Sequence, residues 1–161
     1  MNLDCLRERL SQLHFSAELP AVALDRVAEI GELRECHAGE VLFREGSERR
    51  EFYLLISGRL VLTMQVPGRG DVPILTLGPG DPVAWSALIG EGRMTTSAVA
   101  TESARLICIS AERLDNLCCQ DHEFGYYWMR ALAIALSQRL MATRWQLLDS
   151  TATMMPQARA T

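Results

Sequence analysis

The residues best placed to bind a ligand lie in one stretch, LGPGDPVAWSALIGEGRMTTSAVA, which covers residues 77–100. It contains a Gly-Pro-Gly-Asp turn, a short helical segment, a glycine-bearing loop and a strand of small residues. Free backbone N–H groups at a helix start can bind an anion such as a phosphate. We therefore expect this stretch to form a lip over a ligand, with hydroxyls from Ser86, Thr95 and Thr96 on or near it.

Residues typical of metal sites and enzymes are few and scattered. The histidines are His14, His37 and His122, in three separate elements, whereas a metal site inside a β-barrel needs two or three imidazoles and a carboxylate together. Cys118 and Cys119 are neighbours in a predicted helix, where adjacent side chains diverge by about 100° and seldom form a disulfide. No nucleophile arrangement or phosphate-binding P-loop is suggested. We expect no metal site and no enzymatic activity.

Composition narrows the class of protein further. The chain has 161 residues, a net charge of −4 and 22% charged residues, which fits one domain with a core and argues against a general nucleic-acid binder. No apolar run reaches the roughly 20 residues needed to cross a bilayer, and the N-terminal segment is amphipathic and charged. Five cysteines without a CxxC pair form a poor disulfide framework. We expect a soluble cytoplasmic protein with reduced thiols and no membrane partner.

The pattern of apolar residues predicts a β-roll with flanking helices. Helical spacing over residues 2–14, and again from Pro20 to a stop at Gly31, predicts two N-terminal helices. From residue 33 onward, short apolar runs alternate with glycine turns, which is typical of an antiparallel sandwich or jelly roll and excludes a βαβ sheet. Leu60, Leu62, Met64 and Val66 alternate with Val61, Thr63 and Gln65, which predicts a strand with one buried face. The predicted strands cover residues 33–36, 41–43, 52–56, 60–66, 74–77, 95–100 and 105–109.

The C-terminal part of the chain is predicted to be helical and dimeric. Ser110 can cap a helix over residues 111–119, and Asp121 a longer helix that continues to residue 149. Two apolar faces on that helix indicate that one packs on the roll and the other on a second copy; the second face comprises Leu132, Leu136, Leu140 and Leu147. A coiled-coil seam has alternating steps of three and four residues. The residues with this spacing are Phe124, Tyr127, Ala131, Ile134, Gln138, Met141, Trp145 and Leu148.

These predictions divide the chain into four parts. Residues 1–32 form the N-terminal helices, 33–110 the roll, 111–149 the C-terminal helices with the dimerisation helix, and 150–161 a tail without periodicity that we expect to be disordered.

The order of these motifs resembles the cyclic nucleotide-binding domain family, including the sensor domains of Crp/Fnr regulators. The resemblance covers roughly residues 10–150. It rests on five segments in the right order and spacing, AGEVLFREGS (38–47), FYLLISGRLVLT (52–63), LTLGPGD (75–81), SALIG (86–90) and SAVATESARLICIS (97–110), and on the helix ending QRLMATRWQLLD (138–149). It implies a double-stranded β-helix roll, a dimerisation helix and a role in signal transduction.

The resemblance also tests the lip residue by residue. The family usually carries Phe-Gly-Glu, whose Glu accepts a hydrogen bond from the ribose, and then an Arg that pairs with the cyclic phosphate. Here Phe-Gly-Glu falls on Val83, Ala84 and Trp85, and the Arg falls on Met94. Losing a hydrogen bond to a charged group costs roughly 1.5–3 kcal/mol, which argues against tight binding of cAMP or cGMP. The full set of candidate ligand residues in this degenerate cassette is Gly80, Asp81, Val83, Ala84, Trp85, Ser86, Ala87, Met94, Thr95, Thr96 and Thr143.

Two functional hypotheses remain open at this point. The first is a stand-alone dimeric regulatory domain, without a helix-turn-helix domain, that acts on an unknown protein partner and not directly on DNA. A cyclic nucleotide or another small anion could gate it, with Arg93 as a substitute for the missing arginine only if the loop shifts. The second is a ligand-free scaffold for protein interaction, in which Trp85 and Met94 fill the pocket with core.

Overall fold

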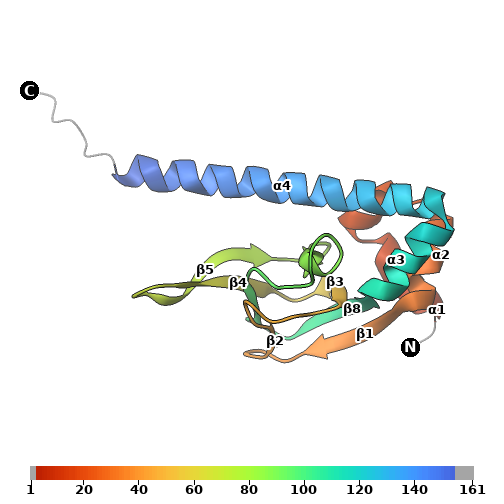
Figure 1. Ribbon diagram of the computed structural model, residues 1–161, viewed down its shortest axis with the longest axis horizontal. Helices are drawn as coiled ribbons and strands as arrows, with labels where there is room; N and C mark the ends of the chain where they lie inside the picture. Colours follow the sequence, from red (N-terminus) through yellow and green to blue (C-terminus); the bar gives the residue numbers. More distant parts are fainter. Residues whose placement is uncertain (1–2, 155–161) are drawn as a thin grey trace, which may run out of the picture.

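The computed structural model describes residues 3–154 and contains two four-stranded antiparallel sheets that face each other (Figure 1). One sheet has the order β1 (Gly31–Cys36), β8 (Ala104–Ser110), β3 (Glu51–Ser57) and β6 (Pro82–Val83). The other has the order β2 (Val41–Phe43), β7 (Ser97–Ala100), β4 (Leu60–Val66) and β5 (Gly70–Leu77). The predicted antiparallel β-roll is confirmed, and the short β6 is an addition to the seven predicted strands.

The helices lie at one end of the roll and along it (Figure 1). The N-terminal segment forms α1 (Leu3–Ser11), a 3-10 helix η1 (His14–Glu18) and α2 (Ala21–Ile30), so the first helix is shorter than predicted. Within the lip, η2 (Trp85–Ala87) is a single 3-10 turn. The roll is followed by α3 (Ala111–Gln120) and the 33-residue α4 (His122–Met154). None of the helices within residues 3–154 is long and apolar enough to cross a membrane.

The predicted alternation of β4 holds over only half of the strand. Leu60 and Leu62 are buried, whereas Met64 is 40% exposed and Val66 is only half-buried. The register with β5 shifts between Leu62 and Thr63, and the β4–β5 hairpin reaches beyond the rest of the roll (Figure 1). The periodicity therefore predicted the strand correctly, but the predicted burial of Met64 and Val66 was wrong. The opposite sheet does not extend far enough to cover this end of the hairpin.

Strand β3 separates two hydrophobic cores. Tyr53 and Leu55 point into the roll, where aliphatic and small residues from both sheets pack together. Phe52, Leu54 and Ile56 point the other way and pack under the helices. Because successive side chains of a strand point to opposite faces, the fully buried β3 supplies both cores at once.

An aromatic cluster centred on Trp128 fills the core under the helices. The Trp128 ring centroid lies 5.2 Å from that of Phe15, 5.6 Å from that of Phe52 and 5.9 Å from that of Phe124. Trp128 is 0% exposed. The cluster joins η1, β3 and α4, and the sequence analysis did not identify Trp128 as its centre.

The two halves of α4 have different surroundings. Asp121 caps the helix as predicted, accepting a hydrogen bond from the Phe124 N–H at 3.0 Å, and the first half packs on the aromatic cluster. Every residue from Leu140 to Thr151 is exposed. The helix continues to Met154, so the prediction of a disordered tail is wrong for residues 150–154, and residues 155–161 lie outside the described part of the chain.

Part of the predicted dimer seam is core instead. Phe124 and Ala131 are buried within this chain, and Tyr127 packs against the same core, so these three positions cannot form a seam with a second copy. Ile134 is half-buried, while Gln138, Met141, Trp145 and Leu148 are exposed. Leu132 is buried on the body, as predicted for the second apolar face, but Leu140 and Leu147 of that face are exposed.

Candidate functional site

The turn that opens the lip is held by bonds within the protein. The Gly80 N–H donates to the Leu55 carbonyl at 2.7 Å, and an Asp81 carboxylate oxygen accepts from the Gly78 N–H at 2.8 Å. Gly80 has φ +90°, and a Cβ at this position would collide with the His14 ring. The other Asp81 carboxylate oxygen lies 3.7 Å from His14 Nε2. Gly80 and Asp81 thus join the turn to β3 and η1. The Gly80 N–H and the Asp81 carboxylate already have partners within the protein.

The backbone at Ala84 supports the assignment of the cassette. Ala84 has φ +59° and ψ +38°, the left-handed conformation that glycine adopts most easily. Within residues 3–154 it is the only residue other than glycine with a positive φ. It stands at the position of the family's Gly. Val83, which precedes it, is buried in the roll core. The left-handed backbone at Ala84 is therefore the conformation that a glycine at this position of a Phe-Gly-Glu cassette would adopt most easily.

The two substituted recognition positions point into different cores. Met94, which the resemblance assigns to the position of the family's Arg, is 2% exposed and packs inside the roll. Trp85, at the position of the family's Glu, is half-buried and packs against the core under the helices. The prediction that both residues fill one pocket is therefore wrong for Trp85, because the η2 turn directs its ring toward the helices.

Backbone pairing fixes the loop that carries Met94. The Met94 carbonyl accepts from the Gly46 N–H at 2.8 Å, and the Met94 N–H donates to the Ser47 carbonyl at 2.9 Å. The Gly92 carbonyl accepts from the Arg49 N–H at 2.8 Å, and Arg93 forms a bridge with Glu48 between them. In such an extended pair, neighbouring side chains point to opposite faces. Arg93 is accordingly exposed while Met94 is buried, so Arg93 does not replace the missing arginine.

The predicted anion cradle is not available at Ala87. Its N–H donates to the Ala84 carbonyl at 3.0 Å within the η2 turn, and the Ala87 side chain is half-buried. Ser86 is buried, and its carbonyl accepts from the Gly92 N–H at 3.3 Å. The Leu88 and Ile89 N–H groups, which follow the turn, both donate to the Trp85 carbonyl, so these donors are not free for an anion either.

The predicted hydroxyl groups do not converge. Thr95 is exposed and Thr96 half-buried. Thr143 is exposed on α4, and its hydroxyl donates to the Arg139 carbonyl of the same helix at 2.9 Å. The hydroxyl that the structure does use here is Ser97, which is buried and accepts from the Glu45 N–H at 2.9 Å. Sequence reasoning missed Ser97 because a serine at the start of a strand resembles any surface hydroxyl.

A cation that sequence reasoning missed connects α4 to the lip. Arg139 Nη2 donates to the Pro82 carbonyl at 2.6 Å. Burial lowers the pKa of this guanidinium, and the nearby Asp81 carboxylate partly opposes that effect. Arg139 follows the polar seam position Gln138, and only the folded helix places it beside β6.

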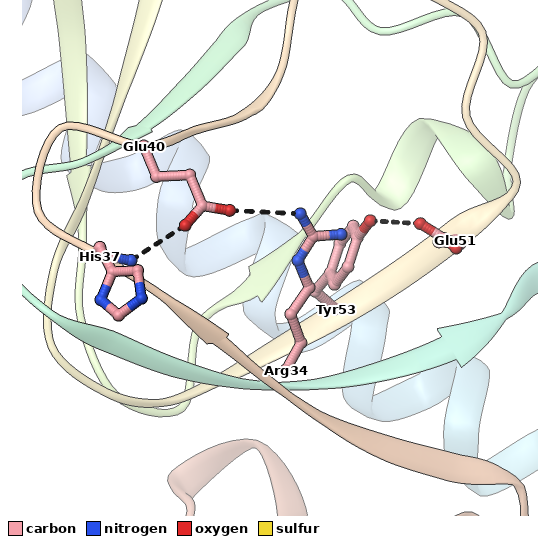
Figure 2. Close-up of polar contacts among 5 residues, drawn as sticks. All are labelled: Arg34, His37, Glu40, Glu51 and Tyr53. Carbon is pink, nitrogen blue, oxygen red and sulfur yellow. Dashed lines mark hydrogen bonds and ion pairs between the residues drawn. The ribbon is translucent and has the colours of Figure 1, made fainter.

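A second polar group lies on the inner face of the β1-β8-β3 sheet (Figure 2). The Tyr53 hydroxyl donates to Glu51 at 2.5 Å, and Arg34 donates to Glu40 at 3.5 Å. The His37 backbone N–H donates to Glu40 at 3.0 Å and lowers the pKa of that carboxyl. Burial raises the pKa of the Tyr53 phenol.

The thiols near this group are protonated at neutral pH. Burial raises the pKa of Cys36, and it raises that of Cys108 to about 11. Since the carboxylates already have partners and the thiols are protonated, the group stabilises the roll and offers no reactive nucleophile. Among residues 3–154, no three His, Cys, Asp or Glu side chains are grouped as metal ligands.

Comparison with known proteins agrees with this geometry. The model of the cyclic nucleotide-binding domain family matches residues 33–121, more than half of the chain. A protein of Geobacter metallireducens GS-15 named as a cyclic nucleotide-binding protein is 29% identical, with a TM-score of 0.73 over 83% of this chain and 97% of that one.

Two further solved structures show the same fold at lower identity. A cyclic nucleotide-binding domain of Methylobacillus flagellatus is 16% identical, with a TM-score of 0.79 over 98% of this chain and 86% of that one. The sensor domain of the Pseudomonas aeruginosa transcriptional regulator DNR is 19% identical, with a TM-score of 0.68 over 86% and 93%.

Proposed function

Because the chain belongs to the cyclic nucleotide-binding domain family, we propose that it is a cytoplasmic regulatory domain that works as a homodimer through α4 and acts on a protein partner. We further propose that its roll has lost tight binding of cAMP and cGMP. The observation that carries the first part is the exposed apolar second half of α4.

The free half of α4 has the residues of an interface. Met141, Trp145 and Leu148 continue the coiled-coil steps and are exposed, with Trp145 at 61%. Fully burying a large apolar side chain stabilises by about 1.5–3 kcal/mol, so pairing of two such helices is favourable. Gln138 supplies one polar position in the seam, a feature that can fix the register of two helices. The seam that we propose begins near Ile134, later than the sequence pattern suggested.

Light scattering with matched variants tests the dimer. The wild type is expected at about twice the chain mass, and the double variant Trp145→Glu, Leu148→Glu at the mass of one chain, because each helix would bring two buried charges to the seam. Gln146→Glu adds a charge to the same part of the helix off the seam and should stay dimeric. A monomeric wild type would rule out the α4 homodimer.

Loss of the nucleotide site rests on Met94 and Trp85. A thioether buried in the roll supplies no charge for a cyclic phosphate, and Trp85 lies on the other side of β3 from the roll interior. Titration of the protein with cAMP and with cGMP in a calorimeter should give no saturable heat up to millimolar nucleotide. Micromolar binding of either nucleotide would contradict this part of the proposal.

The alternative is a ligand-free scaffold, and Met94 favours it over gating by another small anion. Met94 is only 2% exposed and puts an apolar side chain at the position that the resemblance assigns to the phosphate-binding arginine. Calorimetry with inorganic phosphate and sulfate separates the two: saturable binding that is lost in a Ser86→Ala, Thr96→Ala variant would support an anion-gated domain, and no binding would support the scaffold.

A further inference from the structure

A groove of about 620 Å³ lies outside the roll, between the loop of residues 87–92, α3 and the start of α4. Its apolar lining comes from Leu88 in the loop, Leu114 in α3, and Trp128 and Met129 in α4. No residue of β4, β5 or β7 lines it. The groove is therefore separate from the roll interior, and loss of the nucleotide site leaves it unchanged.

The groove contains a hydrogen-bond donor without an acceptor. Trp128 lines the groove and is 0% exposed, and its Nε1 is buried with no hydrogen-bond partner among the described residues. Buried polar groups in folded proteins nearly always have a partner, and an unpaired donor is unfavourable. The indole signal of Trp128 therefore serves as a reporter of changes at the wall of the groove.

The charges on the groove select a cationic occupant. Glu91, Glu112 and Asp115 line it and are exposed, whereas Arg50 is the cation among its lining residues. Cys118 adds no charge, because burial raises the pKa of its thiol to about 11. Three carboxylates against one guanidinium attract lysine or arginine side chains and repel a phosphate or a nucleotide.

We propose that this groove binds a short apolar segment of a protein partner that carries lysine or arginine. Apolar side chains of the segment pack on Leu88, Leu114 and Met129, and its cationic side chains face the three carboxylates. The inference deepens the proposed function in one respect, since it rests on action through a protein partner and names the chemistry of that partner.

Indole N–H resonances give a direct readout of occupancy. The chain has three tryptophans, Trp85, Trp128 and Trp145, whose indole signals in ¹H–¹⁵N spectra can be assigned with Trp85→Phe and Trp145→Phe and by elimination. The probe is a capped ten-residue peptide of alternating leucine and lysine, titrated into the intact protein. The Trp128 signal is expected to move with saturation because this residue lines the occupied groove, and the other two are expected to stay.

Variants on α3 test the role of charge without disturbing the core. Glu112→Gln with Asp115→Asn should weaken peptide binding three- to tenfold at low salt, and Asp115→Lys should weaken it further. Glu102→Gln removes an exposed carboxylate on the turn between β7 and β8, outside the lining of the groove, and should leave the affinity unchanged. The same peptide with glutamate in place of lysine should not bind.

Three outcomes would overturn the inference. They are no saturable shift at millimolar peptide, equal binding of the glutamate peptide, and movement of the Trp145 signal instead of the Trp128 signal, which would place the peptide on the free half of α4. These outcomes are independent of the proposed function, because light scattering reports the dimer and calorimetry reports the nucleotide site whether or not the peptide binds.

Discussion

The two halves of α4 are made from similar residues and have opposite surroundings. In the first half, Trp128 is 0% exposed and contacts three other aromatic rings. In the second half, Trp145 is 61% exposed, and apolar residues such as Leu147 face solvent beside it. The difference comes from what lies opposite: η1 and the outer face of β3 cover the first half, and nothing within residues 3–154 covers the second. One helix thus both completes the core and presents a surface.

The largest expected effect is at Trp128. Trp128→Ala should lower the free energy of unfolding by about 3–5 kcal/mol, because it leaves a cavity in the middle of the aromatic cluster. Trp128→Phe keeps an aromatic ring and removes the unpaired N–H, so its cost should be below about 1.5 kcal/mol. Urea unfolding of both variants checks this. A cost below 1 kcal/mol for the alanine variant would mean that the first half of α4 is not part of the core.

The next effect is at Arg139, where the two halves of α4 meet. Arg139→Ala leaves the Pro82 carbonyl without its partner and should lower the free energy of unfolding by about 1–3 kcal/mol. The substitution is measured in the Trp145→Glu, Leu148→Glu background, which is expected to be monomeric, so that the unfolding free energy contains no contribution from dimer dissociation. Arg139→Lys retains the charge and should cost less; equal costs for the two would show that the guanidinium geometry, and not the charge alone, matters.

A smaller effect on folding, but a clear one on assembly, is expected at Trp145. Trp145→Ala should change the free energy of unfolding of the single chain by less than about 0.5 kcal/mol, because the side chain is exposed there. It should weaken dimerisation at least tenfold, about 1.4 kcal/mol, since tryptophan is enriched among interface hot spots. Analytical ultracentrifugation over a concentration series separates the two. An unchanged dimer would place the seam elsewhere on α4.

The smallest effect is expected at Thr143, two residues before Trp145. Its hydroxyl donates to a carbonyl of its own helix and faces solvent. Thr143→Ala should therefore change neither the unfolding free energy, beyond about 0.5 kcal/mol, nor the calorimetric response to cAMP. If the wild type binds cAMP and this variant binds it more weakly, Thr143 makes the base contact that the family resemblance implied.

Much of the fold was predictable because it depends on local chemistry. Glycine turns between short apolar runs predicted the roll, and Ser110 and Asp121 were correctly expected to cap α3 and α4. The end of α4 was missed because the apolar residues after Asp149 do not recur at helical spacing. A helix that has already formed can continue for another turn without such spacing.

The candidate site was less predictable. The assignment of Met94 to the position of the phosphate-binding arginine stays a prediction from the motif spacing, and the structure adds that this side chain is buried in the roll core. The direction of Trp85 was not predictable, since Ala84 adopts a left-handed conformation that turns the next side chain toward the helices. Trp128 was missed because α4 is apolar on most of its circumference, and spacing alone allows several buried faces.

The sequence by itself determined the order of the elements, their caps and their turns, because each depends on residues close together in the chain. Only the tertiary structure decided which face of α4 is buried, which core receives Trp85, and where a groove opens beside Trp128. These depend on which side chains of distant segments meet, as when Phe15 and Phe52 cover one half of α4 and leave the other half free.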